Sequence, residues 1–138
     1  TLNFENTKDI DRLRNRVRDA DIVIEGSRPR ALEHLGINAQ EEVERGAIWC
    51  SITGYGRYRE PDRVGFGDDA AAGANLLAEV NDSLWFLGDA IADPLTGATA
   101  ATLIMGHWLG CSSILLDLGL SPTAALYSQG LPSSGETF

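Results

Sequence analysis

The sequence predicts an α/β domain built around a parallel, Rossmann-like sheet. Short apolar runs rich in β-branched residues alternate with segments whose apolar residues recur at helical spacing, and this alternation is typical of a parallel sheet covered by helices. The chain has 138 residues, of which 43% are hydrophobic, enough for one domain with a core of ordinary size. Polar, glycine-rich segments follow the first two apolar runs. Because ligands of open parallel sheets bind at the carboxyl ends of the strands, we expect a ligand site there.

Each element is predicted from its periodicity and its boundary residues. The first helix has Ile10, Leu13 and Val17 on one face, with Thr7 as a candidate N-cap. The segment over residues 54–69 is rich in glycine and charge, and we interpret it as a long functional loop. The expected elements are, in order, a helix over residues 7–20, a strand over 21–26, short helices over 29–35 and 40–45, a strand over 47–53, a helix over 68–80, a short strand over 83–88, a helix over 94–109, a strand over 112–120 and a helix over 121–130 that Ser121 caps.

Net charge and hydropathy narrow the classes of partner. Twenty acidic residues against eleven basic ones give a net charge of −9, which opposes binding to nucleic acid through its phosphates. The chain has no apolar run long enough to cross a membrane, and its N-terminus lacks the order of charged and apolar segments found in a signal peptide. We therefore expect a cytoplasmic protein that binds neither nucleic acid nor membranes.

The two cysteines, Cys50 and Cys111, lie in apolar surroundings. They have no CxxC spacing and no histidine cluster beside them, a pattern that favours buried, reduced thiols over a disulfide or a zinc site. The sequence therefore predicts no metal site.

The stretch GDAIADPLTG, residues 88–97, contains a candidate reactive carboxylate. On local grounds Asp93 is a helix N-cap, because an aspartate before a proline at the first helical position is a common helix start. A capping carboxylate can also react, so a catalytic role and a capping role are compatible.

Four motifs occur in an order that resembles the family III CoA-transferases, the group that includes formyl-CoA transferase, carnitine CoA-transferase and α-methylacyl-CoA racemase. The motifs are ADIVIEGSRPRALEHLGI, CSITGYGRYREP, GFGDDAAAGA and GDAIADPLTGATAA, and the resemblance covers roughly residues 10–129. It implies an α/β fold in which two long chains interlock as rings, and hence a homodimer. It also implies coenzyme A as part of the substrate, with an acyl-CoA thioester as donor and a carboxylic acid as acceptor.

The resemblance also implies a nucleophile. In the family it is an aspartate with a glycine four residues later, and Asp93 with Gly97 matches that register. Asp93 would attack the acyl-CoA carbonyl to form a mixed anhydride and release CoA. CoA would then return to give an aspartyl-CoA thioester, and the acceptor acid would be loaded last.

Five residues are candidates for contacts with CoA. Arginine suits the phosphates of CoA because its guanidinium forms paired, charge-assisted hydrogen bonds. His34 and Leu35 match positions that approach CoA in the family, and Tyr55 either lines the acyl pocket or supports a glycine turn. Family members carry Asn-Phe where this chain has Gly26 and Ser27, so one expected CoA contact is missing or remade. The candidates are Arg28, His34, Leu35, Tyr55 and Arg57.

Two departures from the family leave alternatives open. Racemases carry His-Asp where this chain has Phe66 and Gly67, so we favour a transferase over an α-methylacyl-CoA racemase. The aspartates that follow, Asp68 and Asp69, are expected to cap the alanine-rich helix. In addition, members of the family have further segments before and after the part that this chain matches.

We therefore expect either a single α/β domain over residues 1–138, with 129–138 as a flexible tail, or a fragment of a CoA-transferase large domain that associates with a missing segment. In either case, this chain would be incomplete for catalysis. A noncatalytic partner subunit or pseudoenzyme of the same fold is the main alternative. A stand-alone nucleotide-binding domain is disfavoured because no GxGxxG follows a strand.

Overall fold

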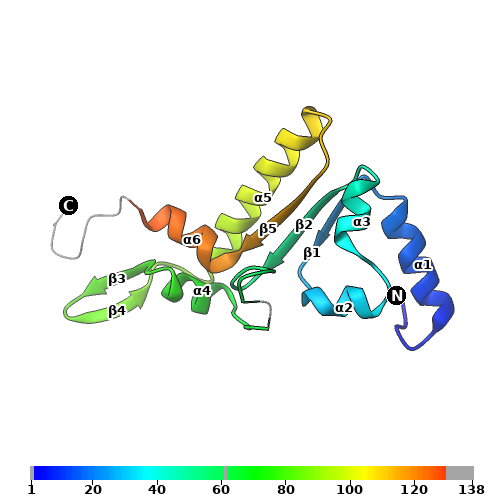
Figure 1. The fold of residues 1–138 in the computed structure, drawn as a ribbon. Coiled ribbons are helices and arrows are strands. Elements are labelled where there is room, and N and C mark those ends of the chain that lie inside the picture. The colour runs from blue at the N-terminus through cyan, green and yellow to red at the C-terminus, as the bar shows by residue number, and fades with distance from the viewer. Residues whose placement is uncertain (1, 61, 130–138) are drawn as a thin grey trace.

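A parallel sheet lies at the centre of the computed structural model, which describes residues 2–60 and 62–129. Ile48 lies opposite Ile22 on one side and Ile114 on the other, so the three strands begin level with one another. The predicted α/β class with a parallel sheet is confirmed. The strands are, in spatial order, β1 (Ile22–Glu25), β2 (Ile48–Thr53) and β5 (Ile114–Gly119) (Figure 1).

Helices cover both faces of this sheet because alternate side chains of a strand point to opposite faces. Trp49 is fully buried on one face, in a cluster with Ile37 and Ala39. Ile48 and Cys50 are buried on the other face. The Trp49 face is covered by α1 (Thr7–Arg18), α2 (Pro29–His34) and α3 (Ala39–Glu44), and the Cys50 face by α5 (Ala92–Leu109) (Figure 1).

Helix α5 packs one side on the sheet and exposes the other. Ala100 and Ile104 are buried against strand residues, whereas Met105 and Trp108 are about half exposed. In the part of the chain that the structure describes, neither this helix nor any other combines the length and apolar character needed to cross a membrane.

A third apolar cluster lies beyond the carboxyl ends of the strands. It joins α4 (Gly67–Gly73), the first turn of α5 and α6 (Leu120–Ser128). The distance between packed helices depends on the side chains at their contact, so alanines allow close packing here. The buried members are Ala70, Ala71, Ala74, Leu76, Ala92, Leu120 and Ala124.

A separate antiparallel hairpin projects from the body of the molecule beyond α4 (Figure 1). Its strands are β3 (Leu77–Val80) and β4 (Ser83–Phe86). The turn residues Asn81 and Asp82 have φ values of 51° and 59°, the left-handed conformation that a tight two-residue turn between twisted strands requires. The large apolar side chains that the hairpin leaves exposed are Val80, Leu84, Trp85, Phe86 and Leu87.

The prediction of one helix over residues 68–80 is wrong in its second half. Helix α4 ends at Gly73, because Asn75 is left-handed with a φ of 57° and the N–H of Leu76 donates to the carbonyl of Ala71 at 2.9 Å. This arrangement is a common helix-ending motif, in which asparagine can take the place of glycine. The residues that follow form β3 instead.

Two predicted caps are also wrong. Asn6, not Thr7, caps α1, since its side chain accepts the N–H of Lys8. Helix α6 begins at Leu120, so Ser121 lies inside it and donates its N–H to the carbonyl of Gly54. The expected tail over residues 129–138 lies outside the described residues from 130 onward.

A buried ion pair joins the ends of β1 and β2. The guanidinium of Arg57 lies 3.3 Å from Glu25 and 3.3 Å from Glu33, and the Arg57 side chain is only 8% exposed. Glu25 also accepts hydrogen bonds from the hydroxyls of Ser27 and Ser51. Burial of Arg57 and Glu25 is therefore compensated by opposite charge and by hydrogen bonds.

Asp117 of β5 completes the connection among the three strands. One carboxylate oxygen accepts the backbone N–H of Arg57 at 2.7 Å, and the other accepts that of Tyr58 at 3.4 Å. The loop after β2 is thereby fixed to the strand next to it.

Removing the Asp117 carboxylate should destabilise the protein, because two backbone N–H groups lose their acceptor. We expect Asp117→Ala to lower the free energy of unfolding by about 1–3 kcal/mol in urea titrations. Asp117→Asn retains one acceptor and should lose less. Equal stability of Asp117→Ala and the parent protein would show that the loop does not depend on this contact.

The two cysteines differ in their surroundings. Cys50 is buried in β2, and its burial, together with the negative charge of Glu25, raises the pKa of its thiol. Cys111 is exposed, so the expectation that both thiols are buried is wrong for this residue. The reason is its place in a left-handed turn, with a φ of 51°, just after α5.

Thiol titration should separate the two cysteines. At a pH near the ordinary thiol pKa, we expect Cys111 to react rapidly with an aromatic disulfide reagent and Cys50 to react only on unfolding. Cys111→Ser should remove the rapid phase. A rapid phase that persists in this variant would mean that Cys50 is accessible.

Candidate active site

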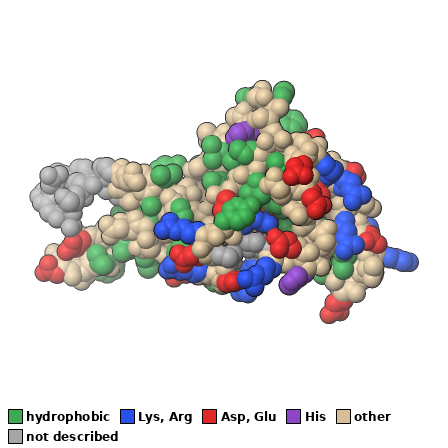
Figure 2. All heavy atoms as spheres, in the orientation of Figure 1, with side chains coloured by type: hydrophobic (Ala, Val, Ile, Leu, Met, Phe, Trp, Pro, Cys, Tyr) green, Lys and Arg blue, Asp and Glu red, His purple; other side chains and the backbone are tan. Residues whose placement is uncertain are grey.

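A pocket opens at the carboxyl ends of β1 and β2, where the alternation of strands and helices predicts a ligand site. Residues 26–28 line it from the end of β1, residues 53–54 from the end of β2, and residues 62–66 from the following loop. Basic side chains gather around this loop, with acidic side chains among them (Figure 2). Two arginines, Arg28 and Arg63, therefore line the pocket together with one carboxylate, Asp62.

The loop that closes the pocket is held by close backbone packing. A Cβ atom at Gly54 would lie 2.9 Å from the backbone nitrogen of Gly65, so the end of β2 and the loop can meet only without that side chain. The ring of Tyr55 supports Gly65 from below and is itself buried. The guanidinium of Arg63 lies 3.6 Å from the centre of that ring. This packing favours the turn-supporting alternative for Tyr55.

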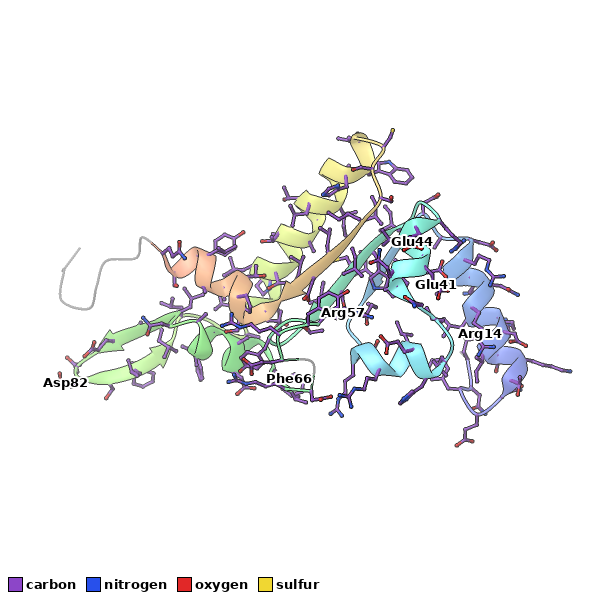
Figure 3. The ribbon with its side chains drawn as sticks, viewed as in Figure 1. Arg14, Glu41, Glu44, Arg57, Phe66 and Asp82 are labelled. Carbon is purple, nitrogen blue, oxygen red and sulfur yellow. The ribbon has the colours of Figure 1, made fainter. Side chains whose placement is uncertain are left out.

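The five candidate CoA contacts occupy different environments. Arg28 is exposed and lines the pocket. His34 is exposed at the end of α2, and Leu35 packs partly buried beside Trp49. Arg57 is engaged with Glu25 and Glu33 at the strand ends, on the other side of the loop from Phe66 (Figure 3). Of the five, Arg28 alone is among the described residues that line this pocket.

Asp93 lies in the first turn of α5 but does not cap it. The helix begins at Ala92, Ile91 occupies the N-cap position, and no side chain caps the helix. The interpretation of Asp93 as an N-cap is therefore wrong, because the chain turns into the helix earlier than the proline at position 94 suggests. The Asp93 side chain is exposed, and in the described ranges 2–60 and 62–129 its carboxylate accepts no hydrogen bond.

The Asp93 carboxylate stands over the start of α4. A Cβ atom at Gly67 would overlap Oδ2 of Asp93, so the carboxylate occupies the space that a side chain at position 67 would need. Gly67 follows Phe66, which lines the pocket. Asp93 itself is not among the described residues that line the pocket; it contacts Gly67, the neighbour of the lining residue Phe66.

Sequence reasoning missed the acidic residues that build this edge of the sheet. Glu25 and Asp117 each stand at or near the end of an apolar strand, and such placement of a charge in a buried run is the signal that could have found them. Asp69 does act at the start of α4, where it accepts the N–H of Phe66 at 3.2 Å. Asp68 does not; it accepts the N–H of Ala90 from a distant segment at 2.9 Å.

Comparison with solved structures identifies the fold. A CAIB/BAIF family protein from Brucella suis superposes with a TM-score of 0.81 at 21% identity, over 97% of this chain and 41% of its own. Rv3272 from Mycobacterium tuberculosis superposes with a TM-score of 0.80 at 18% identity, over 94% of this chain and 39% of its own. The chain thus spans about two fifths of the length of these structures.

Sequence comparison identifies the family. An "Acyl-CoA transferase" of Fusarium pseudograminearum (strain CS3096) is 34% identical over 82 residues, which make up 56% of this chain and 18% of that protein. Residues 1–109 match CoA-transferase family III. Because this match extends over most of the sequence, the chain belongs to the family III CoA-transferases.

Proposed function

We propose that this chain carries the nucleophile of a CoA-transferase, which moves CoA from an acyl-CoA thioester to a carboxylic acid. The observation that carries the proposal is the Asp93 carboxylate, which is exposed, takes no hydrogen bond within the described residues and lies against Gly67, the residue after Phe66 of the pocket lining. A carboxylate without internal partners is available to attack. Membership of the family supports the same reaction class.

The pocket suits the charged part of a CoA thioester. Arg28 and Arg63 both line it and are exposed to an incoming ligand. A hydrogen bond to Glu60 raises the pKa of Arg63, whose guanidinium is paired with that carboxylate. Two guanidinium groups offset the repulsion between phosphates and a chain whose net charge is −9.

In the proposed reaction the acyl group passes through Asp93. A carboxylate oxygen attacks the thioester carbonyl carbon, a C–O bond forms, the C–S bond breaks and CoA leaves as the thiolate. The thiolate then attacks the aspartyl carbonyl of the mixed anhydride, which releases the donor carboxylate and leaves Asp93 as its CoA thioester. The acceptor carboxylate then attacks that thioester, which forms a second mixed anhydride with Asp93 and releases CoA again as the thiolate. The thiolate finally attacks the acceptor carbonyl of this anhydride, which gives the acceptor acyl-CoA and releases the Asp93 carboxylate. Each displacement exchanges groups of similar energy, which is the advantage of covalent catalysis.

The start of α5 supplies the electrostatic setting for these steps. Asp93 lies within the first helical turn, at the positive end of the helix dipole. This positive end stabilises the oxyanion that develops on the attacked carbonyl. It also stabilises the attacking carboxylate, so the rate depends on precise positioning of Asp93 against the thioester.

The remaining candidates take supporting roles in this proposal. Arg57 and Tyr55 are buried, and they hold the loop that closes the pocket. His34 and Leu35 lie at the end of α2, the helix that follows Arg28, and remain candidates for contacts with CoA outside the pocket. Met105 and Trp108 leave apolar surface exposed on α5, which supports action together with a second copy or a further chain segment.

The backbone at position 67 disfavours the racemase alternative. A racemase of this family would place His-Asp at positions 66 and 67, but any side chain at position 67 would overlap Asp93. Gly26 and Ser27 in the pocket lining instead favour the second candidate, a noncatalytic subunit of the same fold. Because the Asn-Phe side chains of other family members are missing at these two positions, we expect a lower affinity for CoA.

Replacement of Asp93 should distinguish these functions. In the active protein, incubation with acyl-CoA followed by hydroxylamine should convert Asp93 to its hydroxamate, which peptide mass spectrometry locates. Asp93→Asn should abolish both the hydroxamate and turnover while the free energy of unfolding changes by less than about 0.5 kcal/mol, because the side chain is exposed and makes no capping bond.

Asp89→Asn is the matched control, since Asp89 is another exposed carboxylate four positions earlier. It should retain the hydroxamate and turnover. Full turnover by Asp93→Asn would refute the nucleophile. Absence of both turnover and hydroxamate in the parent protein would favour the noncatalytic subunit.

Isotope exchange tests the reaction type. During transfer from a 2-methyl-branched acyl-CoA in deuterium oxide, we expect no deuterium at the α-carbon, because Phe66 cannot transfer a proton. Deuterium incorporation at the rate of turnover, measured by mass spectrometry, would favour a racemase.

A further inference from the structure

We propose that Asp68 is a positioning residue, whose carboxylate holds the turn at Ala90 and thereby sets where Asp93 stands over Gly67. This inference rests on the proposed function, since it concerns the placement of the proposed nucleophile. It follows from the contacts among α4, the segment before α5 and Asp93.

The first contact sets Asp68 apart from its neighbour. Oδ1 of Asp68 accepts the N–H of Ala90 at 2.9 Å, 22 residues away in the sequence. Asp69 instead accepts the N–H of Phe66, at the start of its own helix. Asp69 therefore stabilises the start of its own helix, α4, whereas Asp68 connects α4 to the turn before α5.

The turn that Asp68 holds is unfavourable without support. Ala90 has a φ of 49°, a left-handed conformation that alanine adopts at a cost because its Cβ crowds the backbone. The carbonyl of Ala90 accepts the N–H of Asp93 at 2.9 Å. Through this hydrogen bond, the backbone conformation of Ala90 determines where the backbone of Asp93 lies.

Gly67 supplies the space that this arrangement needs. A Cβ atom at position 67 would lie 2.6 Å from Cβ of Ala90 and would also overlap Oδ2 of Asp93. The left-handed turn and the carboxylate are therefore both seated against the same glycine. Any displacement of the turn moves the carboxylate.

No other side chain performs this task in the described part of the chain. Ile91, the N-cap residue of α5, makes no side-chain cap, and the Asp68 hydrogen bond is the one side-chain contact of this kind to residues 88–94. Apolar packing of Ala92 against α4 and α6 holds the start of α5, and Asp68 adds the side-chain hydrogen bond that fixes the turn before it.

Spectroscopy tests the contact and its effect on Asp93 without relying on activity. In Asp68→Ala we expect the Ala90 amide to lose its protection from hydrogen exchange and the side-chain carboxyl ¹³C resonance of Asp93, assigned by its absence in Asp93→Asn, to shift. Asp68→Asn retains an acceptor and should keep the protection. Asp69→Ala is the matched control, because it removes the other aspartate of the same turn and should leave both signals in place. Unchanged signals in Asp68→Ala would overturn the proposal.

Kinetics of the active protein test the consequence for the reaction. Displacement of a nucleophile by about 1 Å can cost on the order of 100-fold in rate. We expect Asp68→Ala and Gly67→Ala to lower kcat by about 10- to 100-fold with little change in KM, and Asp68→Asn to recover most of the loss. A shifted Asp93 signal with unchanged kcat would refute the positioning role while leaving the nucleophile intact. Turnover that survives Asp93→Asn would refute the proposed function, whatever the spectra of the Asp68 variants show.

Discussion

The buried guanidinium of Arg57 is the interaction on which the carboxyl edge of the sheet depends. It pairs with Glu25 from β1 and Glu33 from α2, while its own backbone N–H is held by Asp117 from β5. A single residue after β2 thus contacts the two neighbouring strands and a covering helix. Loss of Glu25, the buried partner, would leave Arg57 with the exposed Glu33 alone, and breaking a buried pair costs more than the intact pair contributes. The network therefore fixes the shape of the edge more than it adds to stability.

In the proposed reaction, the groups that bind CoA and the group that reacts come from different elements. The pocket is formed by the ends of β1 and β2 and by the loop after β2, whereas Asp93 comes from the start of α5. The two parts meet through Phe66 and Gly67, at the start of α4. A short helix rich in alanine can bridge them because its small side chains let it pack closely against α5 and α6.

Local patterns predicted the sheet well and the polar contacts poorly. The apolar runs around Ile48 and Ile114 are typical of buried strands. The alternation of strands and helices along the chain then favoured a parallel sheet. The end of α4 was missed because an asparagine in an alanine-rich segment can adopt either a helical or a left-handed conformation, and Asn75 adopts the left-handed one. The prediction of Asp93 as an N-cap was wrong for a related reason, since the left-handed residue in the turn before α5 is Ala90 and not a glycine. The partner of Asp68 lies 22 residues away, beyond the reach of any local pattern.

The β3–β4 hairpin has a consequence for how the protein opens. It is a ribbon of two strands with most of its large apolar side chains already in contact with solvent, and it meets the body mainly at α4. Melting the ribbon therefore exposes little additional apolar surface, and small ribbons of this kind have little stability of their own. The ribbon can therefore open locally while the central sheet stays closed.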